Sequence, residues 1–396
     1  MQSFKSPFTF CENMNDIHHY EKRLAYAIER LKKSALTEDD KALILNFVTY
    51  KAARGIGIAR QEKYVRILRE LGEKYVRGSF SSLDQKDIEA AISAIERSKL
   101  TDWTKYDYKL FLKTFMTWLG KADKVSWIPL KKPKKLPDEI ITEHEVSAMV
   151  DAAENLRDKA LIAMLYEGGF RVGELGSLTI KDISFDRYGA IAMVRGKTGM
   201  RRVRLIWSMP YIAQWLEMHP RRDDRDAPLW IKASDARMAL SYDAIRMQLQ
   251  KIAKRAGVHK RVNPHNFRHS RSTHLASKLT ESQMEEYLGW VQGSKMPSIY
   301  VHMSGRDLDA DLLRMYGIEP EEEYQKDELK TLQCPHCKTL NTIGARICIN
   351  CRKPLAVEEV MEREEKAMEM FKDFMDLIAE HPEMMEKFRK FLNQTK

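Results

Sequence analysis

The feature that most limits how this chain can fold is the run PLKKPKKLP at residues 129–137. Its three prolines remove backbone donors and exclude regular helix or strand, so the run should be an extended connection. A chain of 396 residues is also too long to fold around a single hydrophobic core. We therefore predict a multidomain protein, with a first domain at residues 1–125 and a basic linker at residues 126–137.

The segment before the linker has the apolar periodicity of helices. Spacings such as that of Tyr20, Leu24 and Leu31 predict five short helices between residues 17 and 120, which make a small helical domain. Basic residues lie between the apolar positions and form either a solvated face or a set of contacts to nucleic-acid phosphates. These residues are Lys51, Arg54, Arg60, Lys63, Arg66, Lys105, Lys109 and Lys113.

The net charge of the chain is +10 and is unevenly distributed. Residues 356–396 hold 11 acidic and 7 basic side chains, so their charge is −4 and residues 1–355 carry +14. Such an excess suggests a polyanionic partner, most simply nucleic acid, although many basic proteins do not bind DNA. The sequence has no apolar run of membrane-spanning length and no secretory signal pattern. We therefore expect a cytoplasmic protein without membrane association.

An arginine at a helix junction is the first candidate functional residue. An apolar segment that predicts a helix ends in two glycines, and Arg171 follows them. A buried guanidinium needs a partner, which Glu174 could supply. Farther along, residues 190–194 and 202–207 predict a β-hairpin with Lys197 in its turn.

Three more residues carry the side chains of a phosphoryl-transfer site. Pro264 predicts the start of a helix on which His265 and Arg268 share one face, and Tyr300 follows 32 residues after Arg268. Arginine binds two phosphate oxygens at once, histidine transfers protons near neutral pH, and tyrosine can form a covalent intermediate. Each of these residues is also common at ordinary surface or core positions, so the pattern needs further support.

That support comes from a family resemblance. The segments FRVGEL, GKTG, HNFRHSRSTHL, LGW and SIYVH, in this order, resemble the tyrosine recombinases, or phage integrases, over about residues 140–303. The resemblance implies a helical core-binding, or DNA-binding, domain at residues 1–125 and an α+β catalytic domain with a small β-hairpin sheet at residues 138–318. It also implies an enzyme that cuts and rejoins double-stranded DNA without ATP or a catalytic metal, as a homo-oligomer that is a tetramer at synapsis.

The resemblance also implies a role for each motif residue. Tyr300 would attack a DNA phosphodiester and form a 3′-phosphotyrosyl bond. Arg171 and Arg268 would stabilise charge on the non-bridging oxygens. His265 would assist proton removal from the tyrosine or donate to the phosphate, and Lys197 would protonate the leaving 5′ oxygen.

Trp290 stands where the family usually has histidine. Its indole N–H could hold a phosphate oxygen, but it cannot transfer a proton. Tyr287 and Tyr316 are the rival nucleophiles, and the spacing of Tyr287 favours a core position. Three polar residues outside the motif positions are interpreted as DNA contacts or structural residues: Arg202, His269 and Arg271.

Four of the five cysteines fall close together, at Cys334, Cys337, Cys348 and Cys351. Two C-x-x-C pairs with ten residues between them predict a tetrahedral four-sulfur site for structural zinc, in a zinc ribbon at residues 330–355. An iron site of the rubredoxin kind has similar spacing and is the alternative. The ribbon could contact DNA, contact protein or act as a cap.

Residues 356–396 predict an amphipathic C-terminal helix whose methionine-rich stripe suits a partner, such as a second copy, or a return onto this chain. The fold class predicted for the whole chain is multidomain and mainly α. The predicted function is site-specific recombination, as an integrase of a prokaryotic mobile element. Two alternatives remain, which are a non-catalytic zinc-containing DNA-binding protein on a recombinase scaffold and a type IB-like topoisomerase.

Overall fold

The structure is a computed structural model that describes residues 17–133, 139–196, 199–303, 315–317, 329–355 and 368–373. The chain divides into two units. Unit 1 comprises Met1–Asp138 with Ser241–Asp243, and unit 2 comprises Glu139–Leu240 with Ala244–Lys396. No helix in the described part of the chain is both long enough and apolar enough to cross a membrane.

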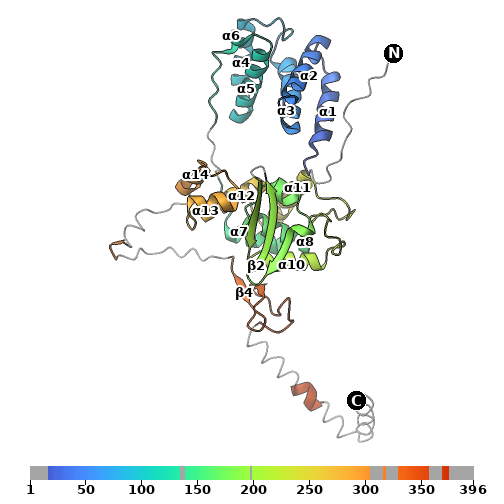
Figure 1. Cartoon of the computed structure of the whole chain (residues 1–396), viewed down its shortest axis with the longest axis vertical. Helices are drawn as coiled ribbons and strands as arrows, with labels where there is room; N and C mark the ends of the chain where they lie inside the picture. The colour runs from blue at the N-terminus through green and yellow to red at the C-terminus, as the bar shows by residue number, and fades with distance from the viewer. Residues whose placement is uncertain are drawn as a thin grey trace. The chain divides into compact units, whose positions relative to one another are not determined.

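Unit 1 is helical, as its periodicity predicts (Figure 1). Thr37 and Thr101 cap the second and fifth helices by accepting hydrogen bonds from backbone N–H groups, which satisfies donors that a helix start leaves free. Phe47, Phe111 and Phe115 are fully buried in its core. The helices are α1 Tyr20–Lys32, α2 Glu38–Ala52, α3 Ile58–Lys74, α4 Gln85–Arg97, α5 Asp102–Trp118 and the short α6 Ala122–Val125.

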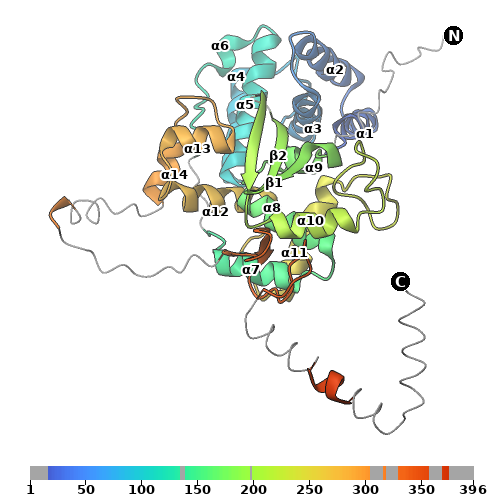
Figure 2. The same ribbon diagram turned by 60° about the horizontal axis from the view of Figure 1, so that its bottom comes forward.

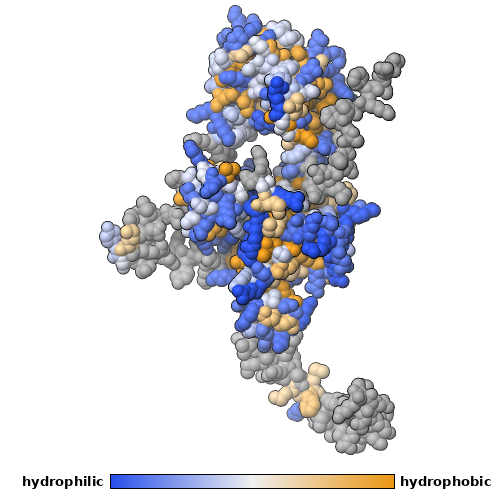
Figure 3. Space-filling model, in the orientation of Figure 1, coloured by the Kyte–Doolittle hydropathy of each residue, from blue (hydrophilic) through white to orange (hydrophobic). Residues whose placement is uncertain are grey.

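The surface of unit 1 resolves part of the question about its basic residues. Lys105 and Lys109 are engaged with Glu96, at 2.6 Å from its carbonyl and 2.5 Å from its carboxylate respectively. Lys63 pairs with Asp107 at 2.6 Å. On the face seen in Figure 3, hydrophobic patches over this unit are small and alternate with hydrophilic side chains. The basic residues of α5 therefore act largely within the fold.

The part of unit 2 up to residue 303 has helices around a small three-stranded sheet (Figures 1 and 2). Thr142 and Glu145 form a capping box that starts the first of these helices. The apolar helix before Arg171 is buried on nearly every side and ends at Glu167. The helices are α7 Glu143–Ala152, α8 Leu156–Glu167, α9 Val172–Gly176, α10 Met209–Glu217, α11 Tyr242–Arg255, α12 Pro264–Ala276, α13 Glu281–Leu288 and α14 Met296–Met303.

The sheet contains the predicted hairpin and one strand more. Strands β2 (Gly189–Gly196) and β3 (Gly199–Leu205) pair antiparallel, with Ala192 opposite Val203. Strand β1 (Ile183–Asp186), which the sequence analysis did not predict, pairs antiparallel with the other edge of β2. It is only four residues long, with one buried side chain, so its sequence carries little alternation. The predicted mainly helical fold with a small antiparallel sheet is confirmed.

Helices α12, α13 and α14 lie together beside the sheet in both ribbon views (Figures 1 and 2). They share a small core that includes Met284, Leu288 and Tyr300. The cysteine segment forms a two-stranded hairpin, with β4 (Thr331–Gln333) antiparallel to β5 (Leu340–Thr342). The predicted C-terminal helix lies outside the described residues apart from 368–373, which are helical.

Candidate active site and candidate metal centre

Helix α12 carries the centre of the candidate active site. Asn263 caps the helix by accepting a hydrogen bond from the N–H of Asn266 at 3.0 Å, and Pro264 occupies the first turn, as predicted. Residues three, four and seven apart share a helix face, so His265, Arg268 and His269 are aligned along one side of α12. α12 packs against α8 and α14, which brings residues distant in the sequence to this face.

Arg268 is buried and is held by backbone oxygens. Its Nη1 donates to the carbonyl of Gly169 at 2.7 Å and its Nη2 to the carbonyl of Leu288 at 2.6 Å. These bonds do not neutralise the guanidinium. Burial, followed by the nearby charge of Arg171, lowers the pKa of Arg268 to about 10. The group therefore stays charged at neutral pH in a site that favours an added anion.

Arg171 approaches the same backbone segment from α9. Its Nη2 donates to the carbonyl of Gly289 at 2.9 Å, and its Nη1 donates to Glu174 at 2.7 Å. The predicted buttressing role of Glu174 agrees with this geometry. Two arginines that are far apart in the sequence thus bind adjacent carbonyls, at Leu288 and Gly289, and their guanidinium groups converge.

Glu174 also binds a second arginine that the sequence analysis did not single out. Arg201, on β3, donates from Nη1 and Nη2 to the two carboxylate oxygens of Glu174, both at 2.8 Å. Burial alone would raise the pKa of Glu174, but Arg201 and Arg171 hold that pKa below its usual value. The carboxylate therefore stays ionised and links the sheet to α9.

Tyr300 is buried, with 2% of its surface exposed. Its ring stacks on Trp290, with ring centroids 5.5 Å apart and planes 8° apart. The guanidinium carbon of Arg268 lies 5.7 Å from the centroid of the Trp290 ring. The Oη of Tyr300 is hydrogen-bonded to Nδ1 of His269 at 2.5 Å. Burial raises the pKa of Tyr300 to about 12, so its hydroxyl is protonated at neutral pH.

The structure brings together five of the six predicted active-site residues: Arg171, His265, Arg268, Trp290 and Tyr300. Lys197 lies outside the described residues. His265 is exposed, and its ring meets that of His269 edge to face at 4.2 Å between centroids. Partial desolvation and the charges of Arg268 and Arg171 lower the pKa of His265.

The two rival tyrosines have different surroundings. The hydroxyl of Tyr287 donates to the carbonyls of Glu167 and Arg204, at 3.0 and 3.1 Å, so its position is structural, as its spacing indicated. Tyr316 is 81% exposed. Arg271 donates to the carbonyl of Glu167 at 3.0 Å, which supports a structural role for that residue.

His269 is the functional candidate that sequence reasoning missed. It was interpreted as a DNA contact or a structural residue, yet it binds the hydroxyl of Tyr300. A signal was available, because His269 is four residues after His265 and adjacent to Arg268, on the same helix face. For Arg201 no such signal exists, because its pairing with Glu174 depends on how β3 meets α9.

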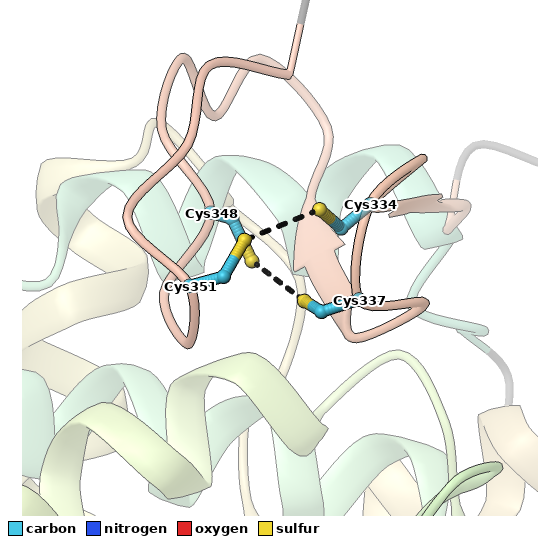
Figure 4. A group of neighbouring side chains, drawn as sticks. All are labelled: Cys334, Cys337, Cys348 and Cys351. Atoms are coloured by element: carbon cyan, nitrogen blue, oxygen red, sulfur yellow. Dashed lines mark hydrogen bonds between the residues drawn. The ribbon is translucent and has the colours of Figure 1, made fainter.

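The four predicted metal ligands converge (Figure 4). All four sulfur atoms lie within 4.8 Å of one another, with 3.6 Å between those of Cys334 and Cys351 and 3.5 Å between those of Cys337 and Cys348. A tetrahedral site with Zn–S bonds of about 2.3 Å needs sulfur atoms about 3.8 Å apart. The donor set therefore fits a tetrahedral ion that prefers sulfur ligands.

A buried amide supports this cysteine cluster. Asn341 is fully buried, and its Oδ1 accepts a hydrogen bond from the N–H of Ile349 at 2.9 Å. Its Nδ2 donates to the carbonyl of Thr339 at 2.9 Å and lies 3.8 Å from the sulfur of Cys348. The two halves of the hairpin are thereby joined next to the sulfur atoms. This is how a second layer of hydrogen bonds orients metal ligands.

Comparison of the sequence with known proteins finds the phage integrase family and several tyrosine recombinases. Residues 139–306 match the phage integrase family. A tyrosine recombinase of Thermosipho africanus is 28% identical over 249 residues, covering 59% of this chain and 85% of that protein. Tyrosine recombinase XerA of Pyrococcus horikoshii is 33% identical over 161 residues, covering 40% of this chain and 55% of that protein.

Solved structures resemble the fold. The XerH site-specific recombinase bound to its difH substrate has a TM-score of 0.51 at 21% identity, covering 76% of this chain and 97% of that one. A lambda integrase dimer bound to a COC′ core site has a TM-score of 0.55 at 15% identity, covering 72% and 82%. At these sequence identities, the structural similarity establishes the fold alone.

Proposed function

Because residues 139–306 carry a phage integrase family domain, we propose that this protein is a site-specific DNA recombinase whose nucleophile is Tyr300. The observation that carries the assignment is the convergence of Arg171 and Arg268 on the carbonyls of Leu288 and Gly289, next to the buried Tyr300. Two converging guanidinium groups, of which only Arg171 is paired with a carboxylate, suit a phosphodiester.

The proposed reaction follows from these positions. Tyr300 Oη attacks the scissile phosphorus, a 3′-phosphotyrosyl bond forms, and the bond to the 5′ oxygen breaks. Arg171 and Arg268 stabilise the charge that develops on the non-bridging oxygens. Lys197, which lies outside the described residues and is assigned by its motif, supplies the proton for the leaving oxygen. Because the phosphotyrosyl bond conserves the energy of the phosphodiester, another 5′ hydroxyl can reverse the step without ATP.

Trp290 has a defined place in this scheme. Its stacking on Tyr300 and its contact with Arg268 make it a platform between the nucleophile and the phosphate-binding arginine. An indole cannot take up or release a proton at neutral pH, so Trp290 orients these groups and does not act as acid or base.

Unit 1 supplies a matching surface for DNA. Lys51, Arg54 and Arg60 lie around the turn between α2 and α3, and among the described residues none of them pairs with a carboxylate. The guanidinium of Arg54 stacks on Tyr50 at 3.5 Å, which holds it in place. These three residues are the proposed phosphate contacts of the helical unit.

A solved tetramer supports an assembly, and the cysteine cluster supports a metal. A lambda integrase tetramer bound to a Holliday junction resembles this fold with a TM-score of 0.51, so we propose a homo-oligomer on DNA, with a tetramer at synapsis. The four cysteines would hold structural zinc in a ribbon that folds only with its ion. Residues 1–125, 138–318 and 330–355 are the proposed DNA-binding, catalytic and ribbon domains.

Covalent trapping tests the proposal. Protein would be incubated with a library of duplexes that each carry a nick, because loss of the short fragment beyond the nick makes cleavage irreversible. A denaturing gel should show DNA linked to the wild-type protein and to Tyr316→Phe, and none linked to Tyr300→Phe. A linked band in Tyr300→Phe would assign the nucleophile elsewhere. Binding with no linked band in the wild type would favour the non-catalytic DNA-binding protein.

A further inference from the structure

The residue that contacts the nucleophilic oxygen is not the motif histidine. Nδ1 of His269 lies 2.5 Å from Tyr300 Oη, whereas no hydrogen bond joins His265 to Tyr300 among the described residues. His265 instead places its ring against that of His269, on the exposed side of the same helix face. His269 therefore lies between an exposed histidine and the buried tyrosine.

The charge state of His269 suits a proton acceptor. Burial, followed by the proximity of His265 and the charge of Arg268, lowers the pKa of His269 to about 4. Because a lowered histidine pKa disfavours the protonated form, the ring is neutral at neutral pH, and one of its nitrogens can accept a proton. Tyr300 needs such a group, since burial has raised the pKa of its hydroxyl to about 12.

Substrate binding strengthens this pairing. The charged and titratable groups that face His269 are His265 and Arg268 from α12 and Tyr300 from α14. A phosphate bound by Arg268 places negative charge beside this cluster and offsets the cations that disfavour imidazolium. This negative charge should raise the pKa of His269 and make proton transfer from Tyr300 easier when the phosphate is in place.

We propose that His269, rather than His265, is the catalytic base that removes the proton of Tyr300 during DNA cleavage, an inference that rests on the proposed recombinase function. As the bond between Oη and phosphorus forms, the phenolic proton moves to Nδ1 of His269. The electron pair of the broken bond leaves on the 5′ oxygen, which takes its proton from the leaving-group acid. In the reverse step His269 returns the proton to Tyr300.

The first test distinguishes activation of the nucleophile from protonation of the leaving group. Single-turnover cleavage would be measured at the position mapped by trapping, with either a normal phosphate or one whose bridging 5′ oxygen is replaced by sulfur. A thiolate leaves without protonation, so this substrate needs only activation of the nucleophile. His269→Gln should lose about 10²–10⁴-fold in rate on both substrates, the usual range for a general base. His144→Gln, at an exposed position on α7, should match the wild type.

The second test distinguishes a base from a merely structural residue. For the wild type, the cleavage rate should level off with rising pH once His269 is neutral in the complex. For His269→Gln, it should keep rising, because solvent must remove the proton. Added imidazole should restore cleavage in His269→Ala but leave the rate of His144→Gln unchanged. Equal thermal unfolding and DNA binding would show that each variant is folded.

The outcomes discriminate between the two levels of the proposal. If the wild type forms no covalent complex on either substrate, the recombinase function itself fails. If the wild type cleaves and His269→Gln cleaves at the same rate, or with a parallel pH profile and no rescue of His269→Ala, His269 is not the base. If the sulfur substrate restores full cleavage in His269→Gln, the histidine acts at the leaving group and the assignment to Tyr300 is overturned.

Discussion

Glu174 is the residue on which the positions of the Arg171 and Arg201 side chains depend. Its two carboxylate oxygens accept hydrogen bonds from the guanidinium of Arg201. They also accept hydrogen bonds from the guanidinium and the backbone N–H of Arg171. The Glu174 side chain is 3% exposed, so water has little access to the arginine groups that it pairs with. Glu174 and Arg201 are buried and Arg171 is partly exposed, so removing the carboxylate leaves a buried guanidinium without compensation.

Replacing Glu174 by glutamine should therefore be costly. We expect Glu174→Gln to lower the free energy of unfolding of unit 2 by about 3–5 kcal/mol, the usual cost of removing one partner from a buried ion pair. Covalent complex formation should fall at least tenfold, because Arg171 loses its anchor. Thermal unfolding and the trapping gel measure both effects.

A matched control is Asp186→Asn, which removes the carboxylate that binds Arg204 at 2.6 and 2.7 Å near the surface. Exposed pairs contribute little, so this variant should unfold and cleave much like the wild type. Wild-type stability in Glu174→Gln would show that the cluster does not need its negative charge.

At the scale of elements, the turn at the end of α13 provides backbone carbonyls that Arg171 and Arg268 bind. Its residue Gly289 closes α13 in the left-handed conformation, with φ +64°, and its carbonyl binds Arg171. A Cβ at this position would lie 2.6 Å from Nη1 of Arg201. The turn therefore requires glycine both for its backbone and for the close approach of the arginine.

Gly289→Ala should act through both causes. Backbone strain contributes about 1–2 kcal/mol, and displacement of Arg201 from Glu174 should add to this loss of stability. Gly257→Ala is the control, because Gly257 also has a positive φ, +70°, but a Cβ added there would meet no atom within 4 Å. Chemical denaturation should show a larger loss for Gly289→Ala. Equal losses would mean that Arg201 moves aside without cost.

The elements also show how far sequence patterns reach. The helix start at Pro264 was predicted correctly, because the start of a helix is decided within a few residues. Strand β1 was not predicted, since a short strand with one buried side chain is specified by its partner β2. The pairing of Arg201 with Glu174 was not predicted either, because it depends on how β3 packs against α9.

At the scale of the whole molecule, the cysteine hairpin is the part that depends most on an added component. The described residues 329–355 carry five basic side chains and no acidic one, and their few buried residues include Cys334, Cys348 and Leu355. So small a core cannot offset the chain entropy of folding without a metal or another crosslink. Unit 1 and the helical part of unit 2 have extensive cores of their own.

Removing the metal should therefore unfold the hairpin alone. Purified protein should contain equimolar zinc, and a strong chelator should release it and expose residues 329–355 to limited proteolysis. Thermal unfolding of the helical units should change little. Cys348→Ser should behave like the chelated protein, whereas Cys11→Ser, which replaces the cysteine outside the cluster, should retain its zinc. A hairpin that stays protected after chelation would rule out a structural metal, and iron in place of zinc would favour the alternative.

The sequence by itself determined the features that arise within one helix turn or one short motif. It placed Arg171 at a helix junction, His265 and Arg268 on one face of α12, and four cysteines at metal-binding spacing, because local geometry follows from local spacing. Only the tertiary structure decided which histidine reaches Tyr300. His269 and Tyr300 lie 31 residues apart, and their contact exists because α14 packs against α12. Periodicity shows which residues share a face, but packing between helices decides which of them contacts Tyr300.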